Sequence, residues 1–270
     1  MRHIIYMLAM VLLMQTTSFA TWSVIAIDRA TGRVSIASAT CVPQGRFAGF
    51  PAKGLMDVQA VVVPGVGVAA CQAGVDSTRA NQMLVFTELQ KGTHPDEILR
   101  LLKQDPQIER RQFGILDMTG RSTGFSGSGN SASSLSIQGR VAGTEIYFSV
   151  QGNILASDNV MHDAAEAFRK ATGSLTDRVM AAMEAADAQG GDSRCTCETE
   201  PLPSAACDGK TSHVAYILMA EKGDTNGTSF NDGTYSLYIS ATDEDIQPNE
   251  NANPVKTLRM RYDLAMRSHQ

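Results

Sequence analysis

Runs of apolar residues, broken by glycine, proline and aspartate, alternate with polar stretches along most of the chain after residue 20. The run Val24-Ile25-Ala26-Ile27 is apolar at four consecutive positions. Because consecutive side chains of a strand point to opposite faces, this run has to be covered on both faces. We therefore predict buried strands, the first two joined by a tight hairpin. The predicted strands are residues 21–27, 33–40, 60–63, 66–71, 111–117, 146–150, 213–220 and 235–240.

Five other segments carry apolar residues at the spacing of an amphipathic helix. Ser174 with Asp177 resembles a capping box at the start of one of them. Two stretches lack either pattern: the Gly- and Ser-rich residues 124–139 are predicted to be a loop, and Gln151-Gly152-Asn153 a turn. The predicted helices are residues 79–90, a segment that starts near 93–95 and carries 98–102, residues 157–172, residues 174–189 and residues 255–265.

The elements follow one another as strands, two helices, strands, two helices, strands and one helix. Both helix pairs need a sheet to cover, and the central strands are apolar on both faces, so we predict an α+β fold. Its economical form is two stacked sheets with helices outside, a four-layer α/β/β/α sandwich. A three-layer α/β fold is the alternative. Residues 21–242 are expected to form one domain, with the linker and helix of residues 243–270 packed on it.

Residues 1–20 are typical of a secretory signal peptide. Arg2 supplies the positive start, residues 4–13 the apolar core, and Ser18-Phe19-Ala20 a small-x-small cleavage site. The apolar core is shorter than the roughly 20 residues that a membrane span needs. We therefore expect cleavage after Ala20, a secreted or periplasmic protein and no membrane span.

The charge of the chain narrows the classes of binding partner. The formal net charge is −5 and no basic block is present, which argues against nucleic acid as a partner.

Export would bring five cysteines into an oxidising compartment, so disulfides are expected. We predict that Cys41 pairs with Cys71 and that Cys207 pairs with Cys195 or Cys197. A metal at the Cys-x-Cys motif is the alternative, but the motif lacks a second pair or a nearby histidine, so we expect no metal and no cofactor.

Cleavage after Ala20 would make Thr21 the first residue of the mature chain. Such a threonine carries a hydroxyl and an α-amine on the same few atoms, so that the nucleophile and its base come together. An α-amine has a pKa of about 7.7 to 8.0 and is partly neutral near pH 7, whereas a hydroxyl barely ionises there. The sequence therefore predicts that Thr21 is a catalytic nucleophile.

Several blocks of the chain resemble an uncharacterised bacterial family, the domain of unknown function 1028, which is grouped with the N-terminal-nucleophile (Ntn) hydrolases. The resemblance implies an Ntn-type four-layer fold and a terminal threonine nucleophile, and by analogy a homo-oligomer. It implies no known substrate. Two departures are Cys71 and the Cys195-Thr196-Cys197 segment, where the family pattern differs. The blocks are residues 21–28, 67–72, 111–117, 151–155 and 190–194.

Five further residues are candidates for the site. Acyl transfer needs donors aimed at the oxyanion, and the side-chain amides of Asn153 and Gln72 are the candidates for this role. Asp192 would orient the terminal amine, and Arg194 would bind a substrate carboxylate, although a salt bridge between the two is the alternative. Lys53 would be a nearby cation that lowers the effective pKa of the nucleophile.

These features predict an exported amidohydrolase that cleaves a small-molecule or peptide amide through an acyl-enzyme on Thr21. Two alternatives share the fold. One is a secreted binding or structural protein that has lost turnover, and the other is an acyl or glutamyl transferase, which shares the first half of the reaction.

Overall fold

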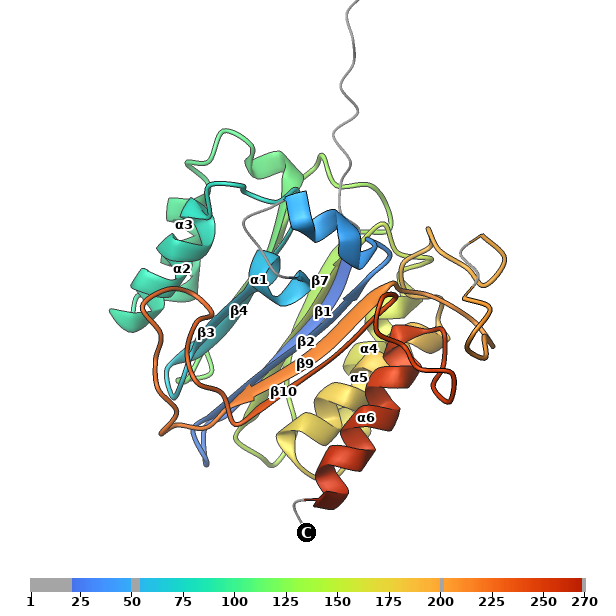
Figure 1. Ribbon diagram of the computed structural model, residues 1–270. Coiled ribbons are helices and arrows are strands. Elements are labelled where there is room, and N and C mark those ends of the chain that lie inside the picture. Colours follow the sequence, from blue (N-terminus) through green and yellow to red (C-terminus); the bar gives the residue numbers. More distant parts are fainter. Residues whose placement is uncertain (1–20, 50–53, 200–201, 269–270) are drawn as a thin grey trace, which may run out of the picture.

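The computed structural model describes residues 21–49, 54–199 and 202–268 (Figure 1). Within these residues, six strands form an antiparallel sheet in the order β10-β9-β2-β1-β8-β7. The first strand of the chain is thus an inner strand of this sheet. The strands are β1 (Thr21–Asp28), β2 (Arg33–Thr40), β7 (Leu135–Arg140), β8 (Ile146–Asn153), β9 (Val214–Ala220) and β10 (Leu237–Thr242).

A second antiparallel sheet, again counted over the described residues, has four strands in the order β3-β4-β5-β6. It faces the first sheet, since β1 contacts β4 and β5, and β8 contacts β5. The fold is therefore α+β with two antiparallel sheets. The strands of the second sheet are β3 (Ala60–Val63), β4 (Gly67–Ala73), β5 (Arg111–Asp117) and β6 (Ser122–Ser126).

Helices pack on both sheets (Figure 1). The four-stranded sheet carries α2 (Ala80–Gln90) and α3 (Pro95–Leu102), and the six-stranded sheet carries α4 (Asn159–Lys170), α5 (Leu175–Ala188) and α6 (Pro254–Ser268). The capping box predicted at Ser174 and Asp177 is present at the start of α5. Two short elements, η1 (Gln44–Gly49) and α1 (Leu55–Gln59), follow β2, and α1 contacts β2, β4 and β9.

Strand β1 divides its side chains between two cores. Trp22 and Val24 pack with α4 and α5 in one core, while Ile25 and Ile27 pack between the two sheets in the other. A third core joins the outer face of the four-stranded sheet to α2 and α3. The apolar run of β1 is therefore covered on both faces, as its sequence predicts.

Two predictions of local structure are wrong. Residues 124–139 are not one loop, because they hold the end of β6 and most of β7. Gln151, Gly152 and Asn153 are not a turn, because they continue β8 to its end. Strands β6 and β7 are half-buried and rich in serine and glycine, so hydrogen bonding to β5 and β8 forms them rather than a pattern of apolar residues.

The disulfides are Cys41–Cys195 and Cys197–Cys207, which confirms one predicted pairing and corrects the other. Cys71 is buried and outside any disulfide. Its side chain packs in the core under α2 and α3, whereas Cys41 lies beyond the end of β2, next to the loop after α5. The predicted Cys41–Cys71 bridge does not form because the two side chains lie in different parts of the fold.

Candidate functional site

Thr21 lies at the start of β1, between β2 and β8. It pairs with Asn153 of β8, and the next residue, Trp22, pairs with Ala39 of β2. Alternation along the strand places Thr21 on the same face as Ile25, which is the face toward the second sheet. Thr21 is only 2% exposed. Its side chain therefore belongs to the space between the sheets, at one end of that space.

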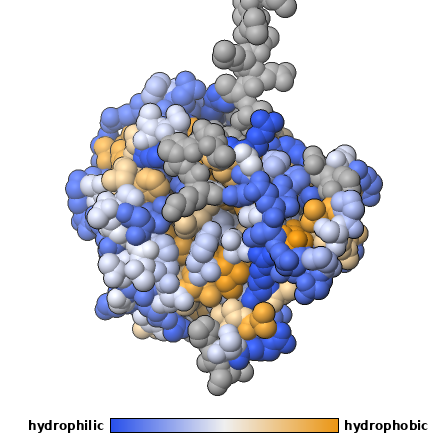
Figure 2. Space-filling view, viewed as in Figure 1, coloured by the Kyte–Doolittle hydropathy of each residue, from blue (hydrophilic) through white to orange (hydrophobic). Residues whose placement is uncertain are grey.

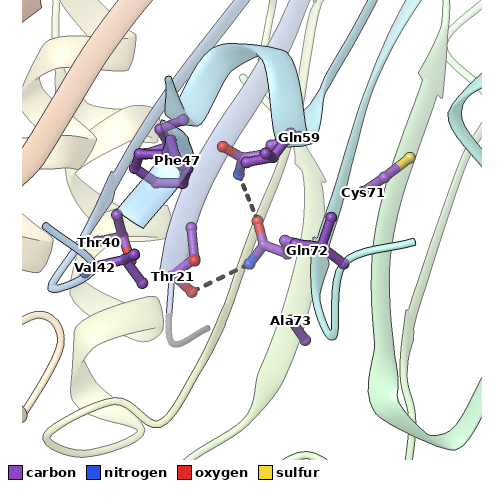
Figure 3. A pocket seen from close by; sticks show the side chains of 11 residues that line it. Thr21, Thr40, Val42, Phe47, Gln59, Cys71, Gln72 and Ala73 are labelled. Carbon is purple, nitrogen blue, oxygen red and sulfur yellow. Dashed lines mark hydrogen bonds between the residues drawn. The ribbon is translucent and has the colours of Figure 1, made fainter. Parts of the chain in front are cut away.

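A small cavity lies beside Thr21 (Figure 3). Its volume is about 10 Å³, roughly the space that one water molecule needs. Figure 3 shows the side chains of Gln59 and Gln72 extending toward each other above Thr21, with Thr40 and Val42 on the other side. The lining residues are Thr21, Thr40, Val42, Phe47, Leu55, Val58, Gln59, Cys71, Gln72, Ala73 and Val75.

Gln72 of β4 fastens the start of β1 to the opposite sheet. Its Nε2 donates to the backbone oxygen of Thr21 (3.1 Å) and to Oε1 of Gln112 (2.7 Å). Its Oε1 accepts from Ser23 Oγ (2.7 Å) and from Gln59 Nε2 (2.8 Å). Each donor and acceptor of the amide is engaged, so Gln72 holds the backbone of Thr21 in place.

Asn153 and Gln112 extend this buried network. Asn153 Nδ2 donates to Gln112 Oε1 (3.1 Å), and Gln112 Nε2 donates to the backbone oxygen of Gly152 (2.8 Å). Gln151 Nε2 donates to Ser23 Oγ (2.5 Å). Asn153 is fully buried, and its Oδ1 has no hydrogen-bond partner among the described residues. Asn153, which pairs with Thr21 on the neighbouring strand, therefore carries a buried acceptor without a donor among the described residues.

Asp192 and Arg194 lie in the loop after α5 and pair with each other. Arg194 donates through Nε to Oδ1 of Asp192 (3.0 Å) and through Nη2 to Oδ2 (2.7 Å). Oδ2 also accepts from the backbone N–H of Cys41 (2.8 Å). The carboxylate is buried, while a third of the Arg194 side chain is exposed. Asp192 thus fixes the residue that follows Thr40, beside the start of β1.

The predicted site residues fall into two groups. Thr21, Gln72 and Asn153 belong to one hydrogen-bond network between the sheets. Asp192 and Arg194 form an ion pair at the neighbouring end of β2. Lys53 lies outside the described residues.

Burial keeps the titratable groups near the cavity neutral. It raises the pKa of the Cys71 thiol, so Cys71 is not a thiolate nucleophile. It also raises the pKa of Tyr216, whose hydroxyl donates to Gln59 Oε1 (3.3 Å). No charged side chain lines the cavity in the described part of the chain. Among the described residues, the cavity lining therefore supplies no charged general base, and the buried carboxylate of Asp192 lies outside that lining, bound to Arg194 and to the Cys41 N–H.

Sequence reasoning missed Gln59, Gln112 and Ser23. A signal was present, because each is a polar residue next to or within a run that is otherwise apolar. Buried polar groups need partners, and several of them in different strands indicate that they bind one another. The partner of each, however, depends on how the two sheets are placed.

Two facing antiparallel sheets with helices on them, and a buried amide network at the start of β1, define an α+β protein with a polar site between its sheets. The sequence pattern of the family of unknown function DUF1028 matches residues 21–207. The chain therefore belongs to this family, which confirms the resemblance found in its sequence.

The chain is also similar to a solved structure from the same family. This is the crystal structure of a protein from Silicibacter pomeroyi, with 21% sequence identity and a TM-score of 0.62 over 92% of this chain and 89% of that one. At this identity the likeness shows a shared fold. No curated protein matches the chain. Among the described residues, none of the helices has the length and apolar character needed to cross a membrane.

Proposed function

We propose that the protein is an exported N-terminal-nucleophile amidohydrolase whose nucleophile is the hydroxyl of Thr21. The observation that carries the proposal is the position of this residue: it is the first residue of the family match, and it faces a cavity between two sheets. The arrangement of helices outside two facing sheets also agrees with a four-layer α/β/β/α sandwich of the Ntn type. The proposed nucleophile requires, in addition, that residues 1–20 be removed as a signal peptide.

In the proposed reaction, the α-amine of the mature Thr21 takes the proton of its own hydroxyl. The oxygen forms an ester bond with the substrate carbonyl, the amide C–N bond breaks, and the proton passes to the leaving amine. Water then attacks the ester, the α-amine again accepting a proton, and the acid product leaves with the hydroxyl restored. The same amine serves as base and acid in both halves of the reaction.

The neighbouring residues take supporting roles in this proposal. Gln72 keeps the backbone of Thr21 fixed, because its amide donates to the Thr21 carbonyl. Asn153 is the candidate for contact with the reacting atoms, because its amide is buried opposite Thr21 and has an acceptor without a partner in the described residues. Presenting Nδ2 to an oxyanion would require Asn153 to give up its bond to Gln112 Oε1, whereas its Oδ1 is placed to accept an N–H from the substrate or from the α-amine without rearrangement. Asp192 and Arg194 brace the end of β2 next to the site.

Export agrees with the two disulfides, because disulfides persist in oxidising compartments. The bridge Cys41–Cys195 joins the end of β2 to the loop that holds Asp192 and Arg194. Oxidation of both cysteines would thus hold the end of β2 and the Asp192–Arg194 pair together beside the site.

Chemical labelling of the mature protein tests the nucleophile. A chain that begins at Thr21 should gain the mass of one β-lactone electrophile, with the adduct on Thr21 in a peptide digest. Thr21→Ser should keep labelling, and Thr21→Val, of similar shape without the hydroxyl, should lose it while the protein stays folded.

The matched control is the same protein with Ala20 retained, which has the Thr21 hydroxyl but an amide in place of the α-amine. It should not be labelled. Equal labelling of the Ala20-extended chain, or of Thr21→Val, would contradict the proposal, and so would an exported protein whose amino terminus is not Thr21.

A further inference from the structure

The walls of the cavity beside Thr21 are apolar where a substrate would touch them. Val42 and Phe47 come from the segment after β2, Leu55 and Val58 from α1, and Val75 from the loop after β4. The first four are buried. An acyl group held at Thr21 would therefore lie against aliphatic and aromatic carbon.

The two amides in the wall are engaged with protein partners. Gln59 donates to Gln72 and accepts from Tyr216, and Gln72 donates to Thr21 and Gln112. All donors and acceptors of Gln72 are engaged, and among the described residues Gln59 keeps one N–H beyond its bond to Gln72, so the two amides offer a charged substrate group one neutral donor and no charge. No lysine, arginine or histidine lines the cavity in the described residues, so a carboxylate on the acyl group would have as its partner only the α-amine of Thr21, which the proposed reaction needs in its neutral form.

The cavity is also small, about 10 Å³, and the residues that line it are packed in the core between the sheets. Cores tolerate added methylene groups poorly, because each forces side chains or backbone to move. We infer that the substrates are amides of short, uncharged aliphatic acids of two or three carbons. This inference rests on the proposed function. Leu55 and Val58 set the length limit, and the amine side of the substrate is left to the solvent side of the site.

A panel of p-nitroanilides that differ only in the acyl group tests this inference on the mature protein. Acetyl and propionyl anilides should be cleaved best. The kcat/KM for hexanoyl anilide should be lower by about 10-fold or more, and for succinyl anilide by about 100-fold, because the described cavity lining offers its carboxylate no cation.

Three variants sharpen the panel, one of them a control. Leu55→Ala should raise the hexanoyl-to-acetyl ratio of kcat/KM by about 10-fold. Leu89→Ala removes the same atoms from an equally buried site on α2, under the other face of the four-stranded sheet, and should leave the ratio unchanged. Val75→Lys, at a half-buried edge of the cavity, should raise succinyl cleavage by about 10-fold relative to acetyl.

The outcomes separate the two proposals. If no anilide is cleaved and the β-lactone does not label Thr21, the hydrolase proposal fails. If Thr21 is labelled and succinyl or hexanoyl anilide is cleaved as well as acetyl, the hydrolase proposal stands and the inference about the acyl group is overturned. An unchanged hexanoyl-to-acetyl ratio in Leu55→Ala would also overturn it.

Discussion

The space between the two sheets has two unlike halves. In one half, Ile25, Ile27 and Ile36 of the six-stranded sheet pack against aliphatic residues of the other sheet. In the other half, Ser23 of the same strand β1 meets Gln72, and the contacts are hydrogen bonds between side-chain amides, hydroxyls and backbone oxygens. The change from one chemistry to the other occurs within two residues of β1.

This difference separates stability from position. Burial of apolar surface is roughly proportional to area and has no direction, so the apolar half stabilises the fold without fixing any one atom. Hydrogen bonds require short distances and favourable angles, so the polar half fixes the start of β1. The part of the molecule proposed to carry chemistry is also the part where geometry is most strictly specified.

The largest expected effect comes from the disulfide that closes the polar half. Cys41 and Cys195 are separated by 154 residues, so replacing both by serine should lower the free energy of unfolding by about 4 kcal/mol. Serine at Cys197 and Cys207, which are 10 residues apart, should lower it by about 2 kcal/mol. Urea unfolding of the three proteins checks this. An equal decrease in the free energy of unfolding for both variants would contradict the prediction, because the long-range bridge Cys41–Cys195 would then stabilise the fold no more than the local bridge Cys197–Cys207.

A pair of substitutions of similar cost compares the halves directly. Gln72→Leu keeps the volume but leaves Ser23, Gln59 and the Thr21 carbonyl without their partner, and Ile36→Ala removes buried carbon from the apolar half. Each should lower the free energy of unfolding by about 3 kcal/mol.

Labelling of Thr21 should then distinguish the two variants. Gln72→Leu should label at least about 10-fold more slowly, because the proposed nucleophile is no longer held, whereas folded Ile36→Ala should label at the rate of the unchanged protein. Slower labelling of both variants, measured per folded molecule, would remove the distinction between the halves.

The smallest expected effect lies at the edge of the polar half, where Asp105 pairs with Arg111 at the start of β5 (2.8 Å). Burial alone would raise the pKa of Asp105, but hydrogen bonds from Asn81, the Gln107 N–H and Arg111 lower it below its ordinary value of 3.8. A lowered pKa stabilises the fold above pH 3.8, and this contribution is lost as the pH falls through the pKa of the folded state.

Asp105→Asn should therefore lose less stability than the unchanged protein on acidification from pH 7 to pH 3, by about 1 kcal/mol. Guanidinium unfolding at both pH values measures this. The matched control is Asp96→Asn, which makes the same chemical change on a side chain that is 70% exposed and outside the Asp105–Arg111 pair. An identical pH dependence in Asp105→Asn and the unchanged protein would contradict the prediction.

The apolar half could be predicted from the sequence and most of the polar half could not. Residues 33–40, 60–63 and 111–117 begin and end as their patterns predict, because those strands are buried in a regular way. The sequence identifies Gln72 as a candidate through its amide, but its partners are 13 to 79 residues away in the chain, and only the placement of the sheets brings them together. The incorrect prediction of a Cys41–Cys71 bridge has the same cause, since the sequence does not tell on which face of a sheet a cysteine lies.

Figure 2 shows polar residues over much of the visible face of the molecule, with apolar patches between them. Among the described large apolar residues, the exposed ones are Tyr238, Met260 and Leu264, on β10 and α6. None of them lies on β1 or lines the cavity. These exposed apolar residues therefore lie outside the candidate site.

The pairing of β1 on both sides has a consequence for how the mature chain is made. Proteolysis acts on backbone that has opened, and from Trp22 onward this chain is held by hydrogen bonds to β2 and β8. If residues 1–20 are removed as proposed, pairing on both sides would protect β1 from further trimming.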